Sequence, residues 1–117
     1  MAYSKAFQFE TPYDINHIVS HYGKALSYPA RVLIMRWLAA EGPKHAGEIS
    51  EFIDLSRATT SHHLASLERA GIITGTEHGR HVVYEFNDLN FPIMRGFIET
   101  VFNEVEAAAG IKTRKKG

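Results

Sequence analysis

The sequence predicts a mainly α-helical domain that carries one small β-hairpin. Apolar residues recur at three- and four-residue spacing in several stretches, which is typical of helices buried on one face. Two short segments rich in β-branched and aromatic residues flank a glycine-containing turn, which indicates a hairpin. The predicted order is helix, helix, helix, helix, strand, strand, helix. The 117 residues, 44% of them hydrophobic, suit one domain over residues 14–110, with an extended arm at 1–13 and a basic tail at 111–117.

Two helices are predicted in the first third of the domain. An apolar stripe at i, i+3, i+4, i+7 and i+11 runs from Ile15 to Leu26 and predicts the first helix. Pro29 suits the first turn of a second helix, because its fixed φ is helical and it has no N–H to leave unpaired. Gly42 and Pro43 end that helix.

A short third helix and a longer fourth helix follow, joined by a tight connection. Ile49 marks the apolar face of the third helix, and Asp54-Leu55 provides the connection. Ser56 is a good N-cap for the fourth helix, since a serine hydroxyl accepts hydrogen bonds from first-turn N–H groups. The Thr60, Leu64, Leu67 stripe of the fourth helix is predicted to face the core, and Gly71 to close the helix.

The hairpin consists of IITGTE and VVYEF, joined through His78-Gly79-Arg80-His81. The last helix begins after Asn90 and carries a long apolar stripe that a small domain can hardly cover alone. We therefore predict that the chain dimerises through its first and last helices. The predicted interface residues are Ile15, Ile18, Val19, Tyr22, Met94, Phe97, Ile98, Val101, Phe102 and Val105.

The opening turn of the fourth helix predicts a DNA-reading surface. Small and polar side chains leave that turn narrow enough for the major groove and able to hydrogen-bond to bases. An arginine at the tip of the adjoining hairpin suits the negative potential of a neighbouring minor groove. The features together predict a winged helix-turn-helix that binds double-stranded DNA. The predicted DNA contacts are Ser56, Arg57, Ala58, Thr59, Ser61, His62, His63 and Arg80.

Residues 24–87 resemble the ArsR-type winged-helix transcriptional regulators. The resemblance rests on KALSYPARVLIMRWLAAEG and LSRATTSHHLASLERAGIITGTEHGRHVVYEFN. It implies a homodimer, built from the first and last helices, that represses a promoter until a metal or another effector releases it. Twofold symmetry implies a roughly palindromic operator. The matching signature positions are Leu26, Pro29, Arg31, Ser61, His63, Leu64, Leu67, Ala70, Gly71, Gly79, Arg80 and Tyr84.

The metal-site patterns of that family are not matched. The chain has no cysteine, the third helix reads HAGEIS where thiolate ligands would lie, and the last helix has no histidine. His17 and His21 have the i, i+4 spacing of a ligand pair, but two ligands do not make a site. We predict no metal and no cofactor, with a non-standard site at these histidines as an alternative. The effector, whether a metal, an organic ligand or a protein, stays open.

The sequence also bears on other possible functions and on the location of the protein. Lys+Arg and Asp+Glu both total 13, so net charge does not indicate a polyanionic partner. Ser61 next to His62 or His63 lacks an oxyanion donor, and no enzyme is predicted. A winged-helix module for protein contacts is a second alternative, but a polar turn with Arg57 and Arg80 favours DNA. No apolar stretch is long enough for a membrane span, which predicts a cytoplasmic protein.

Overall fold

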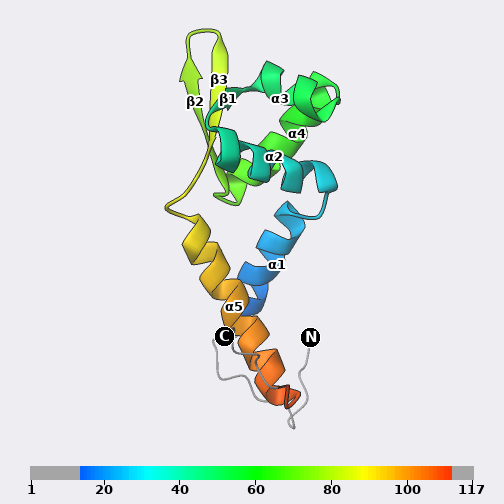
Figure 1. The fold of residues 1–117 in the computed structure, drawn as a ribbon, viewed down its shortest axis with the longest axis vertical. Coiled ribbons are helices and arrows are strands. Elements are labelled where there is room, and N and C mark those ends of the chain that lie inside the picture. The colour runs from blue at the N-terminus through cyan, green and yellow to red at the C-terminus, as the bar shows by residue number, and fades with distance from the viewer. Residues whose placement is uncertain (1–13, 112–117) are drawn as a thin grey trace.

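The computed structural model describes residues 14–111, which form five helices and three strands (Figure 1). The predicted order of helices and hairpin strands is confirmed, and one short strand is added to it. The predicted arm at 1–13 and most of the predicted basic tail lie outside the described residues. The elements are α1 (Ile15–Ala25), α2 (Pro29–Glu41), β1 (Lys44–His45), α3 (Ala46–Ile53), α4 (Arg57–Arg69), β2 (Ile73–His78), β3 (His81–Phe86) and α5 (Phe91–Ala108).

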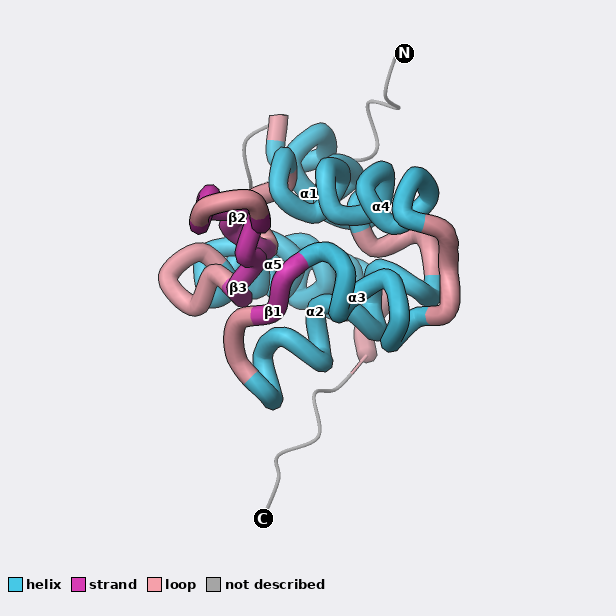
Figure 2. Tube along the Cα trace, turned by 90° about the horizontal axis from the view of Figure 1, so that it is seen from above, coloured by secondary structure: helices cyan, strands magenta, loops and turns pink. Residues whose placement is uncertain are grey.

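The added strand makes the hairpin part of a three-stranded antiparallel sheet. The strand order is β1-β3-β2, and Lys44 and His45 pair with Tyr84 and Val83 of β3. Figure 2 shows the three strands together on one side of the helices α2, α3 and α4. The sequence did not predict β1 because two residues are too short to show an alternating pattern.

The core lies between the helices α2, α3 and α4 and the base of the sheet. Leu64 and Leu67 of α4 are fully buried and Thr60 almost so, which confirms the predicted inward stripe of this helix. Apolar side chains from each neighbouring element meet that stripe, so α4 is held along its whole inner face. The other fully buried apolar residues are Ile34, Leu38, Ile49, Ile72 and Ile73.

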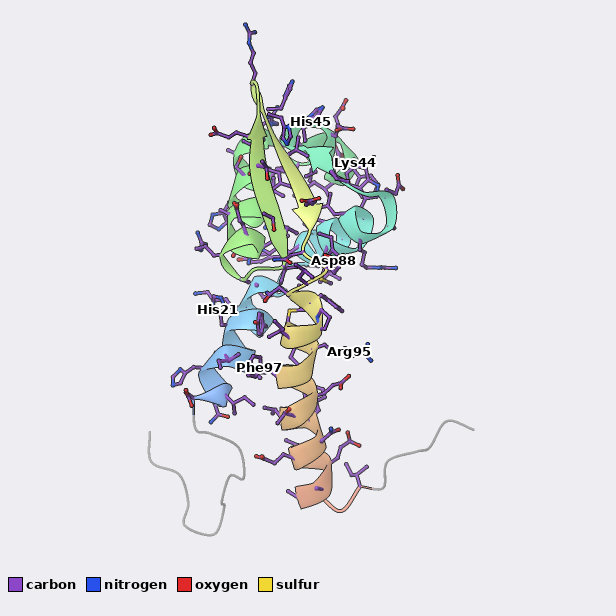
Figure 3. The ribbon with its side chains drawn as sticks, turned by 90° about the vertical axis from the view of Figure 1, so that its left-hand side faces the viewer. His21, Lys44, His45, Asp88, Arg95 and Phe97 are labelled. Carbon is purple, nitrogen blue, oxygen red and sulfur yellow. The ribbon has the colours of Figure 1, made fainter. Side chains whose placement is uncertain are left out.

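The helices α1 and α5 form a second layer at the end of the molecule opposite the hairpin tip. They lie side by side in Figures 1 and 3, and α5 extends well past the start of α1. With 18 residues, α5 is about 27 Å long at the usual rise per residue. None of the helices in the described ranges is long and apolar enough to span a membrane.

Gly71 is a position where only glycine fits. Its φ is +75°, and an added Cβ would lie 2.6 Å from Nδ2 of Asn90, which donates a hydrogen bond to the Gly71 carbonyl. We expect Gly71→Ala to lower the free energy of unfolding by about 1–3 kcal/mol, because the left-handed backbone and the close contact both oppose a side chain.

The matched control for this prediction is Gly96→Ala. Gly96 lies within α5, and an added Cβ would meet nothing within 4 Å. Alanine there should be neutral or stabilising by up to about 1 kcal/mol. Urea denaturation at one protein concentration gives both values, and equal values for the two variants would contradict this view of the Gly71 turn.

Candidate nucleic-acid interface

The turn between α3 and α4 is fixed by backbone geometry and one buried hydroxyl. Asp54 ends α3 in the left-handed conformation, with φ at +55°. Oγ of the buried Ser50 donates a hydrogen bond to the Leu55 carbonyl at 2.6 Å. Because α4 begins two residues later, at Arg57, the two helices form a tight helix-turn-helix pair.

The first turn of α4 is exposed, as the sequence predicts. Ser56 is confirmed as the N-cap: its Oγ accepts from the Thr59 amide at 3.1 Å and contacts Thr59 Oγ1 at 3.0 Å. Two of the predicted contact residues therefore also stabilise the helix start. The side chains that point to solvent over this turn are Arg57, Ala58, Thr59, Ser61 and His62.

The structure does not present His63, one of the predicted DNA contacts, on the exposed face of α4. His63 is buried, with 7% of its surface exposed, because it lies on the same helical face as Thr60, Leu64 and Leu67. Its Nδ1 accepts a hydrogen bond from Nε of Arg31 at 3.0 Å. Burial lowers the pKa of His63 below its ordinary value, and the positive charges of Arg31 and then of His62 lower it further.

The hairpin β2–β3 follows the end of α4, where the Gly75 amide donates to a Glu68 carboxylate oxygen, and it corresponds to a wing. Its register pairs His78 with His81, so Gly79 and Arg80 form a two-residue tip, and Gly79 has the positive φ of 62° that such tips require. Arg80 is exposed. The hairpin tip and the start of α4 lie at the same end of the molecule, away from α1 and α5 (Figure 1).

The start of α3 adds a polar cluster that sequence reasoning missed. His45 caps α3 by accepting from the Glu48 amide, while a Glu48 carboxylate oxygen accepts from the His45 amide at 3.1 Å. The His45 ring stacks on that of His81, with centroids 4.8 Å apart. An added Cβ on Gly47 would lie 3.3 Å from the His45 ring and 3.4 Å from Arg57 Nη1, so Gly47 leaves room for both side chains. In the sequence, the three-residue spacing of His45 and Glu48, which is that of a capping box, could have indicated this helix start.

The proposed metal pair lies on α1, far from the hairpin. His17 and His21 are both exposed, and Figure 3 labels His21 on α1. Within residues 14–111, no three histidine or carboxylate side chains are grouped so that they could hold a metal ion. The described part of the chain therefore supplies no third ligand to this pair.

Part of the predicted dimer interface is already covered within one chain. Ile15, Tyr22 and Met94 are 6%, 8% and 3% exposed, so they leave little surface for a second copy. Tyr22 and Met94 belong to the hydrophobic core, and α1 packs on α5. Ile18, Val19, Phe97, Ile98 and Val101 are half-buried.

The outer part of the α5 stripe remains exposed. Phe102 is 61% and Val105 57% exposed. Ile93, in the first turn of α5 and not among the predicted interface residues, is 54% exposed. These are large apolar side chains on a helix that extends past α1 (Figure 3). That part of the predicted interface is therefore available to a partner and stays a prediction.

Comparison with known proteins identifies the family. Residues 28–74 match the model of the bacterial regulatory proteins of the arsR family. The cadmium resistance transcriptional regulatory protein CadC of Listeria innocua is 39% identical over 83 residues, which cover 71% of this chain and 66% of CadC. The transcriptional repressor SdpR of Bacillus subtilis is 36% identical over 64 residues, which cover 55% of this chain and 70% of SdpR. The chain thus spans slightly under two thirds of the length of CadC.

The fold also matches solved structures. The homodimeric winged helix-turn-helix DNA-binding domain of a possible ArsR-family regulator from Mycobacterium bovis has a TM-score of 0.61 and 19% identity, and the match covers 93% of this chain and all of that domain. A likeness at this identity establishes the fold. Together, the family match and the relatives show that the chain belongs to the arsR family of bacterial regulatory proteins, and its fold is a winged helix-turn-helix.

Proposed function

We propose that this chain is a homodimeric, sequence-specific repressor that binds a roughly palindromic operator in the cytoplasm. In this proposal it acts by binding DNA and not by catalysis. The observation that carries the proposal is the exposed first turn of α4, which presents only small and polar side chains together with Arg57. A helix of this kind can enter the major groove, and the hairpin beside it reaches the flanking groove.

The chemistry of the exposed side chains supports base reading. Arg57 can donate two hydrogen bonds to N7 and O6 of guanine, and His62 can donate to base acceptors or phosphate oxygens. Both side chains are free of the ion pairs found within residues 14–111. Because His63 is held by Arg31, we propose His62 and not His63 as the histidine that meets DNA.

The proposed dimer brings two copies of α4 to the same face of the duplex. The exposed Phe102 and Val105 on the outer part of α5 support it, because such side chains are rarely left in water on a long helix. The homodimeric state of the similar Mycobacterium bovis domain supports it as well. A twofold dimer would contact two half-sites about one helical turn apart.

A direct binding assay tests the proposed function. The full chain is titrated into labelled duplex DNA from the region upstream of its own coding sequence and, in parallel, into shuffled DNA of the same composition. We expect binding to the upstream DNA that is about 1000-fold tighter than to the shuffled DNA and that weakens steeply with salt. Equal binding to both sequences, or none at micromolar protein, would overturn the proposal.

Replacement of the arginine at the hairpin tip is expected to weaken binding with little change in sequence preference. Arg80 is exposed at the tip, and an arginine in a minor groove reads mainly its width and potential. We expect Arg80→Ala to weaken operator binding about tenfold, and its salt dependence to become shallower by about two phosphate contacts, one from each protomer. Titrations at three salt concentrations measure both effects. Unchanged affinity would place the tip away from DNA.

A further inference from the structure

Arg31 is a buried cation that is held without a carboxylate partner in the described part of the chain. It is 3% exposed, and none of the salt bridges within residues 14–111 includes it. Nη1 donates to the Lys24 carbonyl at the end of α1 at 3.2 Å, and the guanidinium lies 4.4 Å from the centre of the Tyr28 ring. Since a buried charge is costly unless its donors are satisfied, each of these contacts matters to the position of Arg31.

The contact to α4 depends on the protonation state of His63. An arginine can only donate, so Nδ1 of His63 must carry no proton to accept from Arg31 Nε at 3.0 Å. A proton on Nδ1 would remove this hydrogen bond and place a second positive charge beside the guanidinium. The Tyr28 ring, 5.3 Å from the His63 ring, covers the pair without offering a negative charge.

The groups of residues 14–111 that are seen to interact with His63 offer no negative charge to neutralise a second cation. The α2 side presents Arg31, the residue before α2 presents Tyr28, and α4 itself presents His62. The end of α1 contributes the Lys24 carbonyl, which Arg31 already occupies. Burial and both neighbouring cations lower the pKa of His63 in the same direction.

We propose that the Arg31–His63 hydrogen bond is an acid-sensitive tether that positions the recognition helix α4 on α1 and α2, and that protonation of His63 releases it and weakens operator binding. Arg31 joins three helices through two hydrogen bonds, one to α1 and one to α4. Because α1 also packs on α5, the tether connects the DNA-reading helix with the layer that carries the proposed dimer surface. Arg31 and His63 are thus positioning residues. The effect on operator binding rests on the proposed function, but the tether itself does not.

The first experiment compares operator affinities at two pH values and one ionic strength. The wild-type protein and the His63→Asn and His21→Asn variants are titrated into operator DNA at about pH 8 and at a pH about one unit below that at which His63 is half protonated in an NMR titration. Asparagine offers an acceptor near Nδ1 but does not titrate. We expect the ratio of the wild-type Kd to the His63→Asn Kd to rise about fivefold or more on acidification, because the neutral fraction of a histidine falls about tenfold for each unit below its pKa. His21→Asn replaces an exposed histidine of α1. For this variant we expect the ratio of the wild-type Kd to the variant Kd to be the same at both pH values. A His63→Asn ratio that changes less than twofold would overturn the proposal.

The second experiment needs neither DNA nor a variant. In an NMR titration of the wild-type protein, the Arg31 Nε–H resonance should shift and exchange faster with water at the pH at which His63 titrates. An Arg31 resonance that ignores the titration of His63 would overturn the tether. If instead the Arg31 resonance follows the titration of His63 but the protein does not bind operator DNA at pH 8, the proposed function is contradicted and the tether is not.

Discussion

Phe102→Glu is expected to produce a folded monomer whose affinity for a full operator is lower by at least about 100-fold. Phe102 is 61% exposed on the outer part of α5, so a charge there disturbs little within one chain. In the proposed dimer, the same charge would be buried in an apolar interface, where it costs several kcal/mol. Separate monomers lose the high effective concentration with which the second half-site is bound. Analytical ultracentrifugation and operator titrations measure the two effects.

Asn103→Glu is the matched control for this prediction. It places the same charge on the neighbouring residue of α5, which is also exposed but points away from the apolar stripe. We expect it to remain a dimer with nearly unchanged operator affinity. If Phe102→Glu were still dimeric, or if it were monomeric and bound DNA as tightly as the wild type, the outer part of α5 would not be the interface that DNA binding needs.

Arg57→Ala and His62→Ala are expected to lower operator affinity and to relax sequence preference. Each side chain is exposed on the first turn of α4, and a good base contact accounts for about 1–3 kcal/mol of discrimination against the wrong base. A dimer carries two copies of each contact, or about 2–6 kcal/mol in total, so Arg57→Ala should weaken binding about 30- to 20,000-fold. Binding to shuffled DNA should change much less.

The control for Arg57 lies on the same helix. Arg69 is an exposed arginine at the far end of α4, and Arg69→Ala removes the same charge without touching the first turn. Titration of each variant against a set of operators with single base changes gives the preference at every position. Equal losses for Arg57→Ala and Arg69→Ala would show that only net charge matters, and α4 would then not read bases.

Most of the fold could be predicted because local signals agree with the packing. Pro29 begins α2, Ser56 caps α4 through its own hydroxyl, and Gly71 has the positive φ that ends the helix region. Each of these signals depends on residues within one turn of the chain. The strand β1 has no such signal, because its two residues become a strand only by pairing with β3.

The candidate site was predicted less completely because side-chain partners come from distant parts of the chain. The periodicity that places Thr60 and Leu64 in the core also places His63 there, so the burial of His63 could have been predicted from the sequence. Its hydrogen bond with Arg31, 32 residues away, could not. In the same way, the stripe on α5 does not show that Met94 is covered within the chain whereas Phe102 is not.

Footprinting of the full chain on an operator selected from random duplex DNA tests the central claim most directly. That claim is that two copies of α4 read two half-sites while the hairpins contact the flanking minor grooves. The account predicts two equal protected regions with twofold symmetric sequences, centred about 10 base pairs apart, and flanking minor-groove protection that Arg80→Ala removes. A single asymmetric region, or protection that does not depend on sequence, would contradict it.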